Sequence, residues 1–354
     1  MTITVIFVYL AIVIAIGALS HRLFRGTGED YFVATRTIGP FILLMSLFGT
    51  NMTAFALLGA SGEAYHAGIG VFSLMVSSSA LIIPIVFFFI GTRLWWLGKK
   101  HGYITQVQYF RERWDSDRLG LALFIVLVGL VIPYLLIGVM AGGLTLSQIT
   151  EGQIPEWLGG LVVCGVVLTY VSSSGLRATA WVNTFQTTVF MVGSIAIFVV
   201  IANALGGPAE ATRRVLEESP ELITRGKMSM RQFFSYGIIV AFSPIVFPQL
   251  FMRLLTGRDP KTLKRIMCFY PIPALVMMFL MATLGMWGSS AIGGLKGAES
   301  DAILPLLLTE YTPIWMMGIL GAAAFSAMMS TMDSQLLSVT TMITRDFFSR
   351  SRLS

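Results

Sequence analysis

A run of hydroxyl side chains near the carboxyl end of the chain could bind a cation. The stretch 321–346 is long enough to cross a bilayer, yet its middle is small and polar. Asp333 adds a carboxylate, and such oxygen atoms suit a hard cation such as Na⁺. A charge inside a membrane is expected to face protein or water. The hydroxyls recur at spacings that place several on one helical face: Ser326, Ser330, Thr331, Ser334 and Ser338.

The same stretch can also be interpreted as a packing surface. Alanines at 322–324 and 327 keep one side of the helix thin, and small residues let membrane helices approach closely. Hydroxyl side chains can in addition donate to carbonyls one turn earlier in their own helix. Composition alone favours neither interpretation over the other.

Two other apolar stretches contain residues that interrupt helices. Pro244 and Pro248 lie within 233–255, where each removes a backbone hydrogen bond. The stretch 46–62 holds Gly49 and further glycines among polar residues. A helix broken in mid-membrane frees carbonyls that can bind an ion. For 46–62, a plain helix with glycine packing faces is the simpler interpretation on composition alone.

The composition is that of a polytopic membrane protein. The 354 residues are 55% hydrophobic and 12% charged, with a mean hydropathy of +0.79. No soluble domain fits between the apolar stretches, so we expect a single membrane domain over 1–354. The nine predicted spans are 3–20, 38–61, 69–96, 119–146, 157–174, 178–205, 232–255, 266–291 and 312–344.

The basic residues predict the orientation. With alternating loops, 18 of the 24 Lys and Arg residues fall on one side, which is typical of the cytoplasmic side. We therefore expect a multi-pass protein of the cell membrane, inner or plasma, with its N-terminus outside and its C-terminus in the cytoplasm. These loops also account for the net charge of +6, so the charge does not indicate nucleic acid binding.

Three motifs resemble those of the sodium:solute symporter family and occur in the family's order. EDYFVATRTIGPF at 29–41 resembles its first inner loop, and SSSGLRATAWVNTFQ at 172–186 is a second match. AMMSTMDSQLL at 327–337 resembles its cation-site helix. The likeness covers essentially the whole chain. Members carry proline, pantothenate, sugars, sialic acid or iodide, so the resemblance leaves the solute open.

The resemblance implies an all-α, LeuT-type fold of two inverted five-helix repeats after an extra N-terminal helix. The interrupted second and seventh spans lie five spans apart, as such repeats require. Residues 1–37 would form the extra helix and first inner loop, 38–205 the first repeat and 232–354 the second. Family members have more than nine spans, so we expect the second repeat to be incomplete, with the chain truncated after the cation-site helix.

Carried onto this sequence, the family's cation ligands are three carbonyls and two hydroxyls. The carbonyls are those of Gly49, Met52 and Ala327, and the hydroxyls are those of Ser330 and Thr331. Five oxygens suit a small hard cation without any carboxylate. The resemblance therefore favours Na⁺, as the coupling ion, over simple bonding of the two hydroxyls within their own helix.

Asp333 leaves two hypotheses open. The family often has acidic residues where this chain has Asn51 and Asn183. Asp333 lies near the position of an optional second sodium ion, which Asn183, Asp333 and Ser334 could hold. Alternatively, Asp333 is a solvated residue near the inner end of its span or pairs with an arginine of the cytoplasmic side.

The resemblance places the solute beside the ion. By position, Asn51, Thr53 and Ala56 should line the solute site, with Tyr134 as a polar cap. Pro244 stands where several members present an aromatic residue. Tyr134 could equally be an ordinary buried tyrosine bonded to a carbonyl. No Lys or Arg is expected deep in a span, so a strongly anionic solute is not expected.

The implied function is Na⁺-coupled symport of a small polar organic solute. His21, His66 and His101 fall in separate loops and no Gly-rich phosphate loop is present, so we do not expect an enzyme. The alternative is a symporter-like sensor or interaction module, or an inactive truncated transporter. The expected partners are a small solute and the lipid bilayer, and the sequence leaves open whether there is a partner chain.

Overall fold

The computed structural model describes residues 2–22, 24, 26–53, 55–150, 152–224, 226–313 and 315–348. Over these residues the chain is helical, with one isolated backbone bridge between Ile38 and Gly257. The α-helices are α1 (Thr2–His21), α2 (Gly28–Val33), α3 (Pro40–Asn51), α4 (Ala60–Ala67), α5 (Gly70–Met75), α6 (Ile83–Val86), α7 (Thr92–His101), α8 (Gln106–Arg113), α9 (Asp117–Ile149), α10 (Glu156–Ala204), α11 (Pro208–Glu218), α12 (Met230–Val246), α13 (Pro248–Leu254), α14 (Pro260–Phe269), α15 (Pro271–Ala291), α16 (Ile303–Tyr311) and α17 (Trp315–Met342). Short π-helical turns span Phe55–Gly59, Val76–Ile82, Phe87–Gly91 and Ile343–Phe348, and 3₁₀ turns span Ala34–Arg36, Pro220–Ile223 and Gly297–Ala302.

Among the described residues, six helices are long and apolar enough to cross a membrane, or eight spans if each of two bent pairs is counted once. Helix α3 and the segment Ala56–Ala67 meet at 71°, and α12 meets α13 at 64°. These bends fall in the second and seventh predicted spans. The prediction that both spans are interrupted is therefore confirmed.

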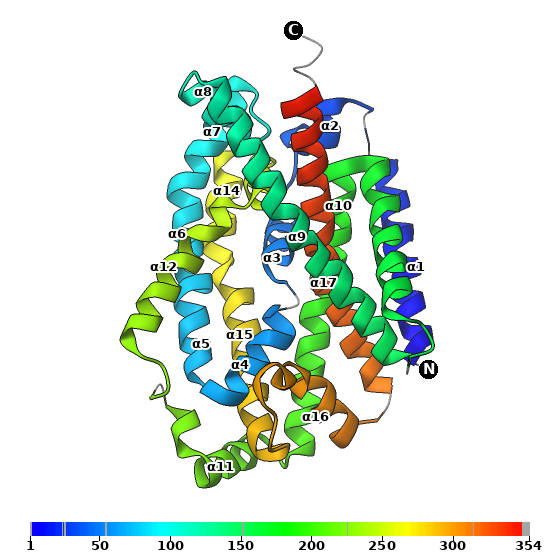
Figure 1. Cartoon of the computed structure of the whole chain (residues 1–354), viewed down its shortest axis with the longest axis vertical. Coiled ribbons are helices and arrows are strands. Elements are labelled where there is room, and N and C mark those ends of the chain that lie inside the picture. Colours follow the sequence, from blue (N-terminus) through cyan, green and yellow to red (C-terminus); the bar gives the residue numbers. More distant parts are fainter. Residues whose placement is uncertain are drawn as a thin grey trace.

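Helix α10 accounts for two of the nine predicted spans. A straight helix of 49 residues would be more than twice as long as the ~30 Å hydrocarbon core is thick. The helix breaks at Gly175, where φ is 53° and ψ is −131°, and in Figure 1 the green ribbon rises beside α1 and then turns back. A Cβ at Gly175 would lie 2.4 Å from the carbonyl oxygen of Tyr31, so both the left-handed backbone and the close packing require glycine.

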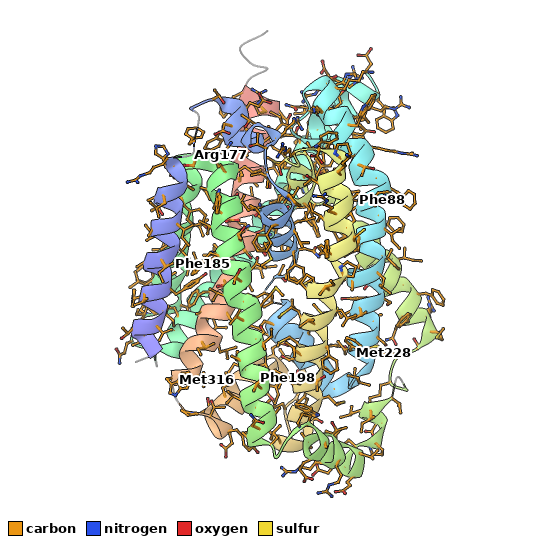
Figure 2. All side chains as sticks on the ribbon, turned by 180° about the vertical axis from the view of Figure 1, so that it is seen from behind. Phe88, Arg177, Phe185, Phe198, Met228 and Met316 are labelled. Atoms are coloured by element: carbon orange, nitrogen blue, oxygen red, sulfur yellow. The ribbon has the colours of Figure 1, made fainter. Side chains whose placement is uncertain are left out.

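An ion pair fastens this reversal to α2. The Nε atom of Arg177 donates to both carboxylate oxygens of Asp30 at 3.2 Å, and Asp30 is fully buried. Tyr31 donates its hydroxyl hydrogen to the carbonyl of Val171 at 3.1 Å. The first two sequence motifs therefore meet in space at one end of the molecule, where Figure 2 shows Arg177.

Helix α17 lies in the interior of the bundle. It packs against α1, α3, α9, α10 and α13, and most of its residues between Met316 and Met342 are buried. Its small and hydroxylated residues therefore face protein, which allows close helix approach and provides hydrogen-bond partners. Helix α9 differs, because it presents Ile125, Leu130 and Met140 outward, as expected of a lipid-facing helix.

The loops predicted to share one side of the membrane lie at one end of the molecule. Figure 1 places α2, α7, α8 and the C-terminal end of α17 at this end, and α11, α16 and the start of α1 toward the other. Of the basic residues behind the orientation, Arg25, Arg225, Arg350 and Arg352 lie outside the described residues. The assignment of the basic end to the cytoplasm stays a prediction.

Cysteine labelling in intact cells tests that assignment. Ala209 in α11 and Lys261 in α14 are exposed and belong to helices toward opposite ends. With Cys164 and Cys268 replaced by serine, we expect a membrane-impermeant maleimide to label Ala209→Cys in intact cells. Lys261→Cys should react only after the cells are opened. Labelling of Lys261→Cys from outside would reverse the predicted orientation.

Candidate functional site

The break after α3 meets two hydroxyls of α17. The backbone becomes extended at Met52 (φ −89°, ψ 96°), so the last carbonyls of α3 lack partners within their helix. Ser330 donates its hydroxyl hydrogen to the carbonyl of Gly49 at 3.0 Å. Thr331 donates to the carbonyl of Thr50 at 3.3 Å. Side chains of α17 therefore satisfy carbonyls that the break sets free.

These contacts bring together four of the five predicted cation ligands. The hydroxyls of Ser330 and Thr331 also lie 3.0 and 3.3 Å from the carbonyl of Ala327, so bonding within the helix and contact with the broken helix occur together. Met52 ends α3 and is buried beside them, but no hydrogen bond in the described part of the chain ties its carbonyl to the other four. A buried set of carbonyl and hydroxyl oxygens has the chemistry that a hard monovalent cation requires.

The carbonyl of Gly49 is positioned by close packing of α3 on α10. A Cβ added to Gly49 would lie 2.0 Å from Oγ1 of Thr187. The hydroxyl of Thr187 donates to the carbonyl of Met45 at 3.0 Å, and this hydrogen bond fixes the direction of Oγ1. Glycine is therefore needed at position 49 for steric reasons, and this places the break within reach of α17.

Asp333 is fully buried and hydrogen-bonded. It accepts from the hydroxyl of Ser334 at 2.7 Å, the amide of Asn183 at 3.3 Å and the hydroxyl of Tyr170 at 3.2 Å. Its Oδ1 lies 3.7 Å from Nη2 of Arg253. The hypothesis of a solvated Asp333 is therefore wrong. The contact with Arg253 agrees with the hypothesis of a partner arginine, while the cytoplasmic side of that arginine stays a prediction.

Arg253 does not lie in a solvated loop. It belongs to α13, is only 2% exposed and donates to the hydroxyls of Ser46 and Ser334. The expectation that no basic side chain lies deep among the spans is therefore wrong. The 64° bend between α12 and α13 explains the difference, because it leads α13 into contact with α3 and α17.

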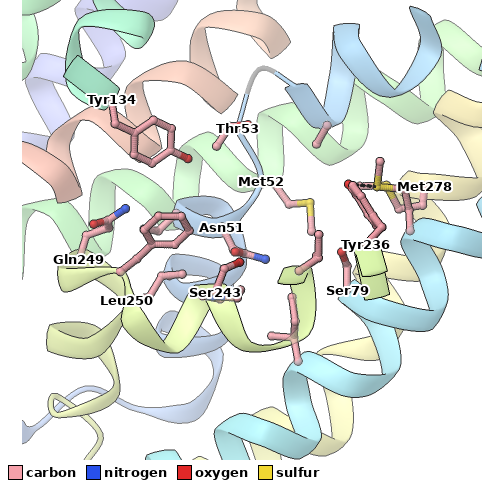
Figure 3. Close-up of a pocket in the computed structure, with 17 residues that line it drawn as sticks. Asn51, Met52, Thr53, Ser79, Tyr134, Tyr236, Ser243, Gln249, Leu250 and Met278 are labelled. Carbon is pink, nitrogen blue, oxygen red and sulfur yellow. Dashed lines mark hydrogen bonds between the residues drawn. The ribbon is translucent and has the colours of Figure 1, made fainter. Parts of the chain in front are cut away.

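A cavity of about 250 Å³ lies beside the break. Its wall comes from both bent pairs and from the spans beside them, and Figure 3 shows Tyr134 and Tyr236 on opposite sides with Asn51 between them. All five residues predicted for the solute line this cavity: Asn51, Thr53, Ala56, Tyr134 and Pro244.

The polar groups of the cavity are partly engaged with the protein. Asn51 donates to the hydroxyl of Tyr270 at 2.7 Å, which fixes the direction of its amide. The ring of Tyr134 stacks on Phe247 with 5.6 Å between ring centroids. Oε1 of Gln249 is buried without a partner among the described residues, so it can accept a hydrogen bond from a ligand.

Sequence reasoning missed several polar residues of this wall. Gln249 and Ser243 each stand beside one of the two prolines of the seventh predicted span. Ser79 is the last of three consecutive serines in the third predicted span. A polar residue next to a helix break was the signal that could have identified them. The partner of Asn51, Tyr270, precedes Pro271 and carries the same signal, whereas Tyr236 carries none.

A second cavity of about 230 Å³ lies beside the first. Thr53 and Tyr134 line it as they line the first, and it also reaches Thr331. Gln335 borders it with both amide atoms buried and unpartnered among the described residues. One predicted ion ligand therefore faces a space that shares two wall residues with the predicted solute site.

The chain is similar in sequence to known transporters. The model of the "Sodium:solute symporter family" matches residues 31–353. The chain is 28% identical over 334 residues to the sodium/pantothenate symporter of Haemophilus influenzae, covering 90% of this chain and 66% of that protein. It is 27% identical to the sodium/pantothenate symporter of Escherichia coli (96% and 71%) and 21% identical to sodium/glucose cotransporter 1 of Oryctolagus cuniculus (99% and 58%). The chain thus spans about two thirds of the length of these relatives.

A solved structure has the same fold. A Na⁺-coupled sialic acid symporter, determined in a substrate-bound outward-open state, superposes with a TM-score of 0.84 at 20% identity. The superposition covers 99% of this chain and 75% of that one. The relatives are secondary transporters in multi-pass membrane folds and not enzymes. Because the family model matches all but the first thirty residues and the last one, the chain belongs to the sodium:solute symporter family.

Proposed function

We propose that this protein couples downhill entry of Na⁺ to uptake of a small polar organic solute. The observation that supports this most directly is the meeting of the Ser330 and Thr331 hydroxyls with the freed carbonyls of α3. Na⁺ would take the place of the hydroxyl hydrogens between these oxygens. The carbonyls of Gly49, Met52 and Ala327 would complete its shell.

The break in α3 gives this coupling a physical route. Gly49 and Met52 belong to the proposed ion shell, while Asn51 and Thr53 line the adjacent cavity. An ion that draws α3 and α17 together therefore also fixes the segment that faces the solute. Coupling requires that Na⁺ favour the state that binds solute, and by linkage the solute must then raise the affinity for Na⁺ by the same factor.

The chemistry of the cavity narrows the solute class. Its described wall presents amide, hydroxyl and phenol groups, and no charged side chain of the described residues lines it. Such a wall suits a small solute with several hydrogen-bonding groups. The named solutes of the relatives provide a defined panel: pantothenate, proline, glucose and sialic acid.

Thermal unfolding of the purified protein tests the proposal. A ligand that binds only the folded state raises the unfolding temperature. We expect a higher temperature in NaCl than in KCl at equal ionic strength, and a further rise when the correct solute of the panel is added with Na⁺. Equal stability in the two salts at all concentrations would contradict the proposed ion site.

A further inference from the structure

A buried ion pair lies one hydrogen-bond step from the proposed Na⁺ ligands. Arg253 and Asp333 are 2% and 0% exposed, with 3.7 Å between Nη2 and Oδ1. The hydroxyl of Ser334 connects the two sites, because it contacts Asp333, the carbonyl of Ser330 at 3.0 Å and Oγ1 of Thr50 at 2.9 Å. Either charge alone would be strongly unfavourable here, so each requires the other.

Two of the three side chains that could hold a second Na⁺ already contact the guanidinium, whereas Oδ1 of Asn183 is buried without a partner among the described residues. Ser334 accepts a hydrogen bond from Nη2 of Arg253. Oδ1 of Asp333 accepts from Ser334 and from Nδ2 of Asn183, and it also faces the guanidinium. Asn183 thus directs the hydrogens of its amide toward the Asp333 carboxylate, whereas a cation would require its amide oxygen there. Asn183, Asp333 and Ser334 are thus arranged around the Arg253 guanidinium, which is a cation that belongs to the protein.

The crevice beside the guanidinium is narrow. The crevice between Arg253 and Ser334 is bounded by Gln249, Leu176 and Leu337 and does not admit a water molecule. The pair is also neutral as a unit. An added Na⁺ would therefore bring an uncompensated charge into the protein interior, which is unfavourable at low dielectric.

Removal of the guanidinium would both open space for an ion and leave a negative charge for it to neutralise. Asp333 would be left as a buried carboxylate with the hydroxyl of Ser334 and the amide of Asn183 close by. After rotation of the amide, these groups would offer the oxygen ligands that a hard cation prefers. The volume of the lost side chain would make room for the ion. A second Na⁺ would then neutralise the charge that Arg253 neutralises now.

We propose that Arg253 is a tethered cation that takes the place of a second Na⁺, so that this chain binds a single Na⁺. The inference rests on the proposed Na⁺ coupling. Arg253 also donates to Ser46 of α3, so the fixed charge joins α3, α13 and α17. A side chain thereby supplies the positive charge, and it stays with the protein when the transported ion leaves.

Equilibrium binding of radioactive Na⁺ to the purified chain tests this directly. We expect saturation at one ion per chain. Saturation at two ions with Arg253 intact would overturn the tethered-cation proposal while leaving Na⁺ coupling in place. The absence of any Na⁺ binding would instead contradict the proposed function itself, so the two failures are distinguishable.

Variants then test the role of the charge. Arg253→Gln is expected to bind two ions per chain, whereas Arg253→Lys, which keeps a tethered cation, should bind one. The double variant Arg253→Gln with Asp333→Asn lacks both charges, and we expect it to bind one Na⁺ per chain. If Arg253→Gln does not fold, the wild-type stoichiometry and the charge-free double variant still decide the matter. A folded Arg253→Gln that saturates at one ion would overturn the proposal.

Discussion

Replacement of Thr331 by valine, or of Ser330 by alanine, is expected to raise the Na⁺ concentration for half-maximal effect about tenfold or more. Each change removes one of the proposed oxygen ligands, and valine retains the shape of threonine. A hydrogen bond or contact to a charged group contributes about 1.5–3 kcal/mol, and about 1.4 kcal/mol corresponds to a tenfold change in affinity. Titration of the Na⁺-dependent rise in unfolding temperature measures the shift.

Two hydroxyls on the same helix provide matched controls. Thr340 donates to the carbonyl of Leu336 at 2.8 Å, and Ser338 donates to that of Gln335 at 2.8 Å, both within α17. Thr340→Val and Ser338→Ala therefore lose the same chemical groups without touching the proposed ion. We expect them to retain the wild-type response to Na⁺. An unchanged response in Ser330→Ala and Thr331→Val as well would refute the site.

Replacement of Gly49 by alanine is expected to abolish the response to Na⁺. The new Cβ would lie 2.0 Å from Oγ1 of Thr187, and moving that hydroxyl away would break its hydrogen bond to the carbonyl of Met45. Helix α3 would have to shift, at a cost of about 1–3 kcal/mol for overpacking. The shift would carry the carbonyl of Gly49 away from Ser330. The same Na⁺ titration measures the loss.

A second substitution should restore the response. Thr187→Ala removes Oγ1, and the next contact of the new Cβ, with Cβ of residue 187, is then 3.4 Å, an ordinary van der Waals distance. We expect Gly49→Ala with Thr187→Ala to respond to Na⁺ again, and Thr187→Ala alone to be tolerated. Gly129→Ala in α9, where no atom lies within 4 Å, serves as a neutral control. A double variant as defective as Gly49→Ala would show that the clash is not the cause.

The parts of the site that the sequence predicted depend on local signals. Prolines at 244 and 248 and glycine at 49 mark where helices cannot continue regularly, so the interrupted spans could be located from residue type. The ligands on α17 followed from the resemblance of its motif to the family's cation-site helix, because helical spacing alone favoured neither ion binding nor packing. The residues around the cavity followed from their positions relative to the family's motifs, which the breaks in the second and seventh spans support.

The parts that the sequence did not predict depend on the direction in which a bent segment turns. Arg253 is followed by Arg258 and Lys261 and has the local environment of a loop residue, yet the bend before α13 buries it against Asp333, eighty residues away along the chain. The contact of Gly49 with Thr187 and the bond from Asn51 to Tyr270 also join distant segments. Hydropathy and motif spacing carry no information on such pairings.

The hydroxyl bonds across the break also bear on how an empty carrier resets. In alternating access, the protein must return without cargo, and a cluster of bare oxygen lone pairs would repel itself during that step. Each hydroxyl of Ser330 and Thr331 offers a hydrogen as well as lone pairs, so it donates to the α3 carbonyls in this structure and would bind the proposed Na⁺ through its oxygen. A carboxylate in their place would need a proton or another cation before the same helices could close.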